Sequence, residues 1–189
     1  MNPVIEAIKK RRSIRSYQSK PVPRELLEVL INAANDAPSS MNSQPWRFVV
    51  IENSDVKRRM VQIAGPKALV IFKPLKTVNP ERYEMVMKRF AELPDPIYYS
   101  APAIIFIIGL NAGASDSCHL ACENIMLAAE SLGLGSCYVK LGSLIADDPE
   151  MQEALEIKGE ERLLGPILVG YANETPEPPA KNAPAVKWI

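Results

Sequence analysis

The stretch Ala103-Ile104-Ile105-Phe106-Ile107-Ile108 is apolar at every position. A half-exposed strand alternates apolar and polar residues, so a continuous apolar run of this length is typical of a central strand that is covered on both faces. Two further apolar runs, 48–51 and 166–171, predict other core strands. Residues 135–141 predict a loop and a strand.

Helical spacing of apolar residues predicts helices around these strands. Asn2 is suited to cap a first helix that has Pro3 at its first position. A second helix is expected to begin at Pro23 and to stop before Pro38. A short helix is predicted over residues 149–157.

Two longer helices carry recognisable end signals. Ser54 is expected to cap one of them and Gly65 to end it. Ser115 is expected to cap the longest helix of the chain, which ends at Gly133. Small apolar residues let backbones approach closely, so this last helix is expected to lie centrally or to pack on its own copy in a dimer. These residues are Ala121, Ile125, Ala128 and Ala129.

The middle of the chain, residues 66–100, is ambiguous. Residues 68–72 fit either a strand or a helix, because a short apolar run does not distinguish the two. Prolines at 74, 80, 94 and 96 break whatever forms there. Residues 83–93 have helical spacing, which predicts one helix in an excursion that covers or flanks a site.

The overall composition excludes several classes of protein. The 189 residues fit one domain, and the net charge of zero gives no general attraction to nucleic acid or to an anionic membrane. No apolar run approaches the roughly 18 residues that span a bilayer. The start of the chain has an amphipathic pattern instead of a signal-peptide pattern, so a cytoplasmic location is expected.

The three cysteines predict neither disulfides nor a metal site. An odd number of cysteines without a signal peptide argues against a disulfide framework. Cys118 and Cys122 lie four residues apart on a predicted helix, where two thiols could share a metal, but no other ligand cluster accompanies them. Buried, inert thiols are therefore expected, and no metal.

Arg11-Arg12-Ser13-Ile14-Arg15 concentrates three guanidiniums and a hydroxyl in five residues at the end of the first predicted helix. Guanidiniums bind phosphate oxygens bidentately, so this cluster predicts a phosphate site. The alternative is a solvated helix end, in which the cations complement the helix dipole. The cluster alone does not decide between the two.

Two other segments are unusual in composition. Residues 37–48 pack hydroxyls and carboxamides into a run that ends in a strand; such a run suits either a ligand site or an ordinary turn. The tail, residues 172–189, is rich in proline and ends in Trp188-Ile189. Prolines keep it extended, and its apolar end favours docking on another surface over fraying in water.

Taken in order, these segments resemble the nitroreductase family of flavin oxidoreductases. The resemblance rests on Arg-Arg-Ser-Ile-Arg-Ser-Tyr at 11–17 and Ala-Pro-Ser-Ser-Met-Asn-Ser-Gln-Pro-Trp-Arg-Phe at 37–48. It continues with Glu-Asn-Ile-Met-Leu-Ala-Ala at 123–129, Leu-Gly-Leu-Gly-Ser at 132–136 and Val-Gly-Tyr at 169–171. No single motif is rare, but the ordered set is specific and covers nearly the whole chain.

The resemblance implies an α+β fold with a mainly antiparallel sheet wrapped by helices, in an intertwined homodimer. Residues 1–189 would form one FMN-binding domain, with 172–189 as a tail that reaches the partner subunit. The implied chemistry is ping-pong: NADH or NADPH reduces FMN, and a small-molecule acceptor such as a nitroaromatic or a quinone takes the electrons. The flavin carries this chemistry, so no catalytic side chain is nominated.

The resemblance also assigns cofactor-binding residues by position. The phosphate and ribityl group fall to Arg11, Arg12, Ser13, Arg15 and Lys181. A wall supplied by the partner subunit falls to Pro38, Ser39, Ser40 and Asn42, braced by Gln44. The reactive edge of the flavin falls to the segment Ser136, Cys137, Tyr138, Val139 and Lys140.

Two departures from the family pattern concern this site. Ala183 stands where a further basic residue is common, which shifts the phosphate contact toward the arginines. The usual glycines are absent from 139–141, where a backbone N–H is expected to contact the flavin. His119 and Glu123 are expected to be structural.

Three functions stay open on the sequence. The first is a reductase of nitro compounds, quinones or related acceptors. The second is a specialised flavin dehydrogenase or reductase that acts on a metabolite, because a fold does not fix a function. The third is a flavin-binding or storage protein without meaningful turnover. The physiological acceptor and the choice between NADH and NADPH are not readable from the residues.

Overall fold

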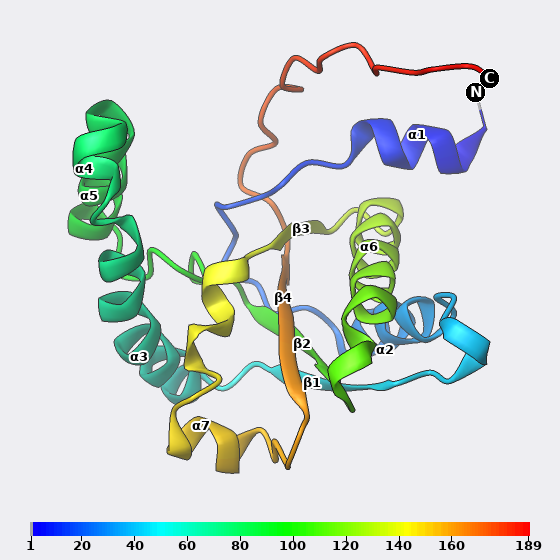
Figure 1. Cartoon of the computed structure of the whole chain (residues 1–189), viewed down its shortest axis with the longest axis horizontal. Helices are drawn as coiled ribbons and strands as arrows, with labels where there is room; N and C mark the ends of the chain where they lie inside the picture. Colours follow the sequence, from blue (N-terminus) through cyan, green and yellow to red (C-terminus); the bar gives the residue numbers. More distant parts are fainter. Residues whose placement is uncertain (1) are drawn as a thin grey trace.

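The computed structural model, which describes residues 2–189, is built on an antiparallel sheet of four strands in the order β1-β2-β4-β3 (Figure 1). The strands are β1 (Trp46–Ile51), β2 (Ala103–Gly109), β3 (Gly135–Tyr138) and β4 (Arg162–Gly170). All four lie where the sequence predicts strands, and the antiparallel sheet expected from the resemblance is confirmed.

Strand β2 is the centre of the molecule, because all seven of its residues are buried. Side chains alternate between the two faces of a strand, so β2 feeds two separate cores. Ile104, Phe106 and Ile108 belong to one core, and Ile105 and Ile107 belong to the other. The predicted central strand covered on both faces is confirmed.

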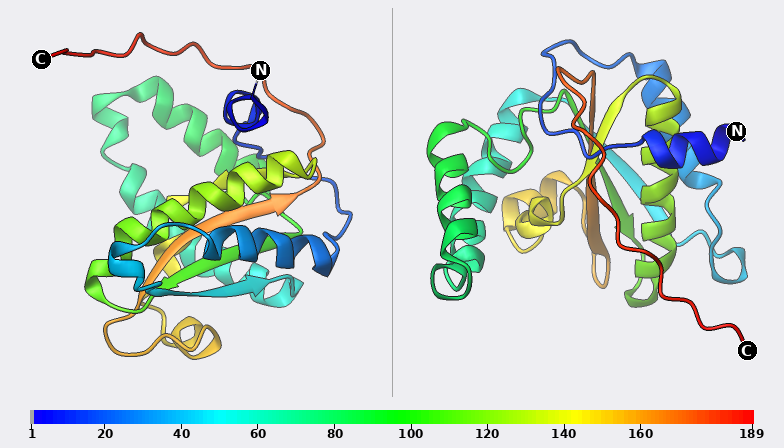
Figure 2. Two further views of the ribbon diagram at one scale, coloured as in Figure 1. Left: turned by 90° about the vertical axis from the view of Figure 1, so that its right-hand side faces the viewer. Right: turned by 90° about the horizontal axis from the view of Figure 1, so that it is seen from above.

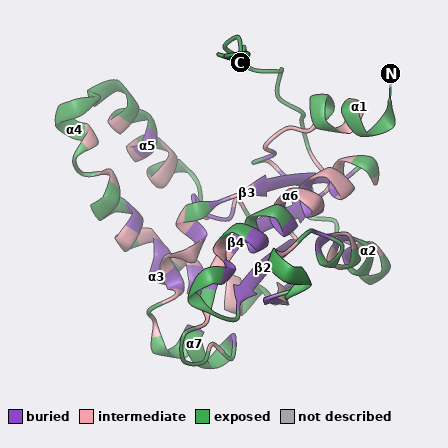
Figure 3. Cartoon of the chain, turned by 45° about the vertical axis from the view of Figure 1, so that its right-hand side comes forward, coloured by how far each residue is buried: buried purple, intermediate pink, exposed green. Residues whose placement is uncertain are grey.

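Helices cover both faces of the sheet (Figure 2). On one face pack α2 (Arg24–Asn35) and α6 (Ser115–Ser131), and on the other pack α3 (Ser54–Phe72), the 3-10 segment η3 (Lys140–Ile145) and α7 (Pro149–Ala154). The inward sides of these elements are buried and their outward sides are exposed (Figure 3). Burying apolar side chains on both faces is the main favourable contribution to folding here.

Helix α1 (Pro3–Lys10) begins as predicted, because the Asn2 side chain accepts a hydrogen bond from the backbone N–H of Val4 at 2.9 Å. It packs against α6. Its apolar stripe nevertheless stays exposed, with 61% of Val4 and 48% of Ile8 accessible to solvent. This stripe is therefore available for contact with another surface.

The prediction that Gly65 ends a helix is wrong, because α3 continues through Pro66 to Phe72. Packing beyond Gly65 favours the continuation: Ala68 is fully buried in the core, and Lys67 donates to the carbonyl of Leu144 at 3.0 Å. At 19 residues, α3 is also longer than the 17-residue α6, which was expected to be the longest helix.

Two predicted helix caps are also wrong. Asn53, instead of Ser54, caps α3: its side-chain oxygen accepts from the N–H groups of Asp55 and Val56. Helix α6 has Ala114 at its N-cap, without a side-chain hydrogen bond. A 3-10 turn, η2 (Ala112–Ala114), directly precedes it.

The ambiguous middle of the chain is helical. Residues 68–72 belong to α3, and α4 (Leu75–Val78) and α5 (Pro80–Glu92) follow it and project away from the sheet (Figure 1). The predicted helix over 83–93 is confirmed. None of the helices among the described residues combines the length and the apolar character needed to cross a membrane.

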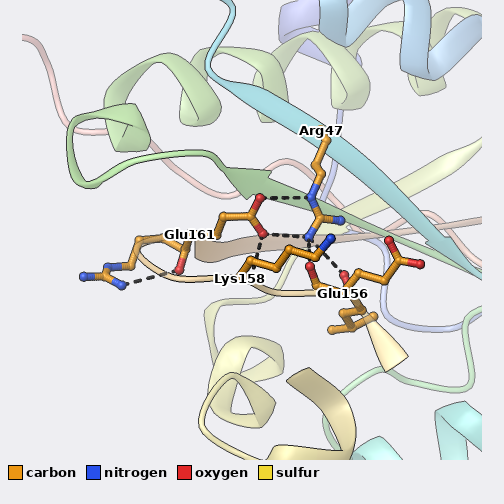
Figure 4. Close-up of polar contacts among 6 residues, drawn as sticks. Arg47, Glu156, Lys158 and Glu161 are labelled. Carbon is orange, nitrogen blue, oxygen red and sulfur yellow. Dashed lines mark hydrogen bonds and ion pairs between the residues drawn. The ribbon is translucent and has the colours of Figure 1, made fainter. Parts of the chain in front are cut away.

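An arginine joins the edge strand β1 to the loop before β4 (Figure 4). The Nη2 of Arg47 lies 2.8 Å from Oε2 of Glu161, and also donates to the carbonyls of Leu155 at 3.1 Å and Glu156 at 2.7 Å. The contact with Arg47 holds the pKa of the Glu161 carboxyl below its usual value. One side chain thus fixes two segments that are more than 100 residues apart in sequence.

Candidate functional site

The arginine cluster and the tail form a cleft of about 610 Å³ beside the end of α1. Its cationic and hydroxyl lining residues are Lys9, Arg11, Arg12, Ser13, Arg15 and Lys181. The rest of the lining is Ile8, Pro176, Glu177, Pro178 and Pro179. The structure therefore brings Lys181 to the arginine cluster, although the two are about 170 residues apart in the sequence.

The three arginines in this cleft differ in their partners. Arg12 folds back on the end of α1, where its Nη1 donates to the carbonyls of Lys9 at 2.7 Å and Arg11 at 2.8 Å. Arg12 thus fits the helix-end alternative. Arg15 is exposed, and among residues 2–189 its Nη1 makes only a long contact of 3.4 Å with the carbonyl of Ser13.

Arg11 carries an unsatisfied donor. Its Nε is buried, and among residues 2–189 it is the buried side-chain nitrogen or oxygen that lacks a hydrogen-bond partner. The Nε forms an ion pair with Oε1 of Glu123, and the 3.6 Å between the two atoms is beyond hydrogen-bond distance. A buried donor of a charged group that lacks a hydrogen bond is costly, which is expected where a ligand supplies the acceptor. Glu123, expected from the sequence to be structural, thus borders the site.

The arginine segment lies along strand β3. Ser13 forms a parallel bridge with Ser136, and the N–H of Ile14 donates to the Ser136 carbonyl at 3.0 Å. Burial raises the pKa of the Cys137 thiol, while Arg15 and Ser13 lower it in part. The structure therefore joins two segments that the sequence assigns to one site.

The backbone N–H groups of residues 136–140 differ in whether the chain already provides an acceptor for them. The N–H of Val139 is used in the sheet, where it donates to the Pro166 carbonyl at 2.9 Å. Lys140 occupies the first position of η3, and first-turn N–H groups have no acceptor within their own helix. If a backbone N–H of 139–140 contacts a ligand, that of Lys140 is the candidate.

The loop of residues 38–44 lies elsewhere. It follows α2 in the chain (Figure 1). None of its residues lines the arginine cleft. Met41, Asn42 and Gln44 have positive φ angles of 52°, 54° and 44°, which are strained for residues with a side chain. The N–H of Gln44 donates to the Ser39 hydroxyl at 2.9 Å, which braces the loop internally. Its role as a wall for a partner's site stays a prediction.

The cysteines are free and buried, as predicted. Burial raises the pKa of Cys118 to about 11 and that of Cys122 to about 12, so both thiols are protonated at neutral pH. Protonated thiols are poor metal ligands and poor nucleophiles.

Sequence reasoning left His119 outside the site, but the fold places it beside one of the predicted site residues. Its Nε2 lies 3.1 Å from the hydroxyl of Tyr138, and its Nδ1 lies 3.4 Å from Oγ of Ser115. The sequence feature that could have indicated this contact was the i, i+4 spacing of Ser115 and His119, which places both side chains on one face of α6. Only the return of the chain through β3 shows that Tyr138 meets that face.

These three residues line a second pocket of about 680 Å³. Lys140 is its one residue with a formal charge at neutral pH, among the described residues that line it. The remaining lining is Ile71, Leu141, Ser143, Leu144, Leu163 and Leu164. It shares no lining residue with the arginine cleft, and β3 connects the two.

Several known proteins are similar to this chain in sequence. The model of the nitroreductase family matches residues 8–171. The putative NADH dehydrogenase/NAD(P)H nitroreductase of Methanothermobacter thermautotrophicus is 28% identical over 173 residues, which are 92% of this chain and 79% of that protein. Iodotyrosine deiodinase of Thermotoga neapolitana is 26% identical over 191 residues, covering 100% and 98%.

A solved structure agrees over the whole chain. The crystal structure of a nitroreductase with bound FMN from Desulfitobacterium hafniense superposes with a TM-score of 0.81 at 25% identity, covering 100% of this chain and 99% of that one. The fold expected from the sequence is confirmed by this likeness.

Proposed function

Because the chain belongs to the nitroreductase family, we propose that it is an FMN-dependent oxidoreductase that takes electrons from NADH or NADPH and passes them to a small-molecule acceptor. The family match and the FMN bound to the Desulfitobacterium relative support the cofactor. The observation in this chain that carries the proposal is the buried Nε of Arg11, which has no hydrogen-bond acceptor, in a cleft lined by further cations.

The cleft fits a phosphomonoester. Such a group carries close to two negative charges at neutral pH and offers several acceptor oxygens. The guanidinium groups of Arg11 and Arg15 keep N–H donors that can bind phosphate oxygens, and Lys181 adds a third positive charge. Arg12 is committed to the end of α1, so we assign the phosphate to Arg11, Arg15 and Lys181, with Ser13 facing the ribityl chain.

The remainder of the cofactor is assigned to the segment from Ser136 to Lys140. This segment leads from the arginine cluster to the second pocket, and four residues of extended chain span roughly 13 Å. We propose that the Lys140 N–H donates to the flavin. When bound, FMN supplies the hydride chemistry, and the residues of this chain bind it, orient it and exclude water.

We further propose a homodimer. The loop 38–44 is strained, exposed and remote from the arginine cleft of its own chain, which suits a wall lent to a partner's site. Residues 1–189 then form one FMN-binding domain per subunit. The tail 172–189 reaches the partner, which would cover Trp188 and Ile189, now 90% exposed and fully exposed.

A second candidate is a reductase dedicated to one metabolite. It is favoured by the relative named iodotyrosine deiodinase, which aligns over essentially its full length. The two candidates share the cofactor and differ in the acceptor.

The proposal is tested by colour and bleaching. The purified protein should be yellow, should bleach anaerobically with NADH or NADPH, and should regain colour when a nitroaromatic or quinone is added. A yellow protein that neither NADH nor NADPH bleaches would support the alternative of a flavin-storage protein. A colourless protein that does not bind added FMN would contradict the proposal.

Deletion of residues 182–189 should weaken dimerisation more than the fold of each chain. Trp188 and Ile189 have no place in either core, so their removal leaves the cores intact. A tryptophan buried at an interface contributes strongly to association. Analytical ultracentrifugation should show a dimer dissociation constant about tenfold higher or more. Urea unfolding of the monomers should show an unchanged midpoint and slope. An unchanged dissociation constant would show that the tail does not dock.

A further inference from the structure

A groove of about 510 Å³, which we call the α3 groove, lies between the first half of α3 and the loop of residues 94–100 that leads toward β2. It shares no lining residue with the arginine cleft or with the second pocket, and none of its lining residues is assigned to FMN. Its volume lies within the usual range for small-molecule sites. The walls include Lys57, Arg58 and Val61 from α3 and Pro94, Asp95 and Ser100 from the loop.

Asp95 fixes the loop wall of the groove. Its carboxylate accepts from the N–H groups of Ile97 at 3.1 Å, Tyr98 at 2.7 Å and Ser100 at 2.9 Å. Tyr99 and Ser100 both have φ angles of 52°, which are strained for residues with a side chain. Strain of this kind persists only where the surrounding structure holds it, and it gathers at ligand sites. A wall that is already ordered lowers the entropic cost of binding a ligand.

Lys57 joins α3 to the end of the same loop and keeps one hydrogen-bond donor. Its Nζ donates to the carbonyls of Ala101 at 3.0 Å and Pro102 at 2.9 Å, and an ammonium group has three N–H donors. Burial lowers the pKa of Lys57, because the protein replaces part of the water that would solvate the charge. An anion in the groove would accept from the third N–H and stabilise the charge.

Arg58 supplies further donors to the groove. Among the described residues it contacts Asp55 through Nη1 alone, at 3.0 Å, so its Nε and Nη2 keep N–H groups for another acceptor. The side chains of Arg58 and Asp55 are 68% and 79% exposed, and an exposed pair of this kind contributes little to stability. A ligand carboxylate can therefore bind the guanidinium at little cost to the fold.

The charges around the groove favour a ligand with one negative charge. Each cation already has a carboxylate neighbour, because Asp95 acts on the charge of Lys57 and Asp55 pairs with Arg58. These carboxylates repel a doubly charged phosphate more strongly than a single carboxylate. The donors that remain on the two cations suit the two oxygens of one carboxylate.

We propose that the α3 groove binds a small aromatic carboxylate. The carboxylate pairs with Arg58 and with the remaining donor of Lys57, and the ring lies between Val61 on α3 and Pro94 on the loop. The side chains of Ser54 and Gln62, which also line the groove, offer hydrogen bonds to a further polar substituent. This site is separate from the cofactor site, so the proposal does not depend on the proposed function.

The test uses a benzoate that carries a trifluoromethyl-diazirine ring in the para position, and the matching benzyl alcohol, which lacks the charge. Irradiation of the purified protein attaches each probe where it is bound, and peptide mass spectrometry locates the attachment. We expect the benzoate to label residues 54–62 or 94–100, with half-maximal labelling at about a tenfold lower concentration than the alcohol. Arg58→Ala should remove this difference between the probes.

Arg24→Ala is the matched control, because Arg24 is also an exposed arginine with an exposed partner, Glu28, and it lies outside the groove. It should leave the labelling unchanged. Equal labelling by the two probes, labelling confined to other segments, or an unchanged preference in Arg58→Ala would overturn the proposal.

Added FMN separates this site from the cofactor site. The loop of residues 94–100 also borders a cavity of about 160 Å³ that is lined by Arg15, so the groove lies near the arginine cleft. FMN should nevertheless leave the benzoate labelling of residues 54–62 and 94–100 unchanged. Displacement of the benzoate by FMN would also overturn the proposal, because the groove would then belong to the cofactor site.

Discussion

Replacing Arg15 by alanine is expected to weaken FMN binding roughly ten- to a hundredfold and to leave riboflavin binding unchanged. A charge-assisted contact with phosphate contributes on the order of 1.5 to 3 kcal/mol. The substitution removes little within the chain, since the hydrogen bond of Arg15 among the described residues is a long contact of 3.4 Å with the carbonyl of Ser13. Riboflavin lacks the phosphate and should not sense the change.

Fluorescence titration of the apoprotein with FMN, riboflavin and FAD measures this effect. FAD should compete poorly in both proteins, because its phosphate is esterified to a bulky nucleotide. Arg24→Ala is the matched control: Arg24 is an exposed arginine that pairs with Glu28 at 3.0 Å and lies outside the cleft. Equal losses for FMN and riboflavin in Arg15→Ala would mean that Arg15 is structural and that the phosphate binds elsewhere.

Arg47→Ala is expected to lower the free energy of unfolding by about 2 kcal/mol at neutral pH. The side chain is only 30% exposed, and that of Glu161 only 15%, so the pair is better shielded than a surface pair. The substitution also leaves the carbonyls of Leu155 and Glu156 without this donor. Urea unfolding of the two proteins measures the difference.

The effect of Arg47→Ala should depend on pH. Because the pKa of Glu161 is lowered in the folded state, the stabilisation is complete above the unfolded glutamate value of about 4.3. It is lost as the pH falls through the lower, folded value. The difference between the proteins should therefore narrow in acid. Arg58→Ala, which breaks the exposed pair with Asp55, should cost less than about 0.5 kcal/mol at any pH.

Local pattern was sufficient to predict every strand and most helices. The apolar run of β2 and the Asn2 cap of α1 depend on neighbours in sequence, which is the range over which periodicity and capping act. The end of α3 was missed because Gly65 and Pro66 are ordinary stop signals, and only the burial of Ala68 against distant segments overrides them. Tertiary packing of this kind has no local signature.

The residues of the candidate site also divide into those that local sequence predicts and those that only the fold brings together. The arginine cluster was visible because its residues are consecutive, and Lys181 was reached through the family resemblance. His119 was set aside, since a single histidine on a helix carries no information about the strand that meets it. Its contact with Tyr138 depends on how β3 returns along α6, which the sequence pattern does not specify.

The strand order bears on how the chain is made. Strand β4 lies between β2 and β3, yet it is the last strand to be synthesised. The sequence of β2 is entirely apolar. Until residue 170 has left the ribosome, the edge of β2 that pairs with β4 has no partner strand. Open apolar edges of this kind associate readily with other chains. The demand on chaperones during translation should therefore fall sharply once β4 emerges.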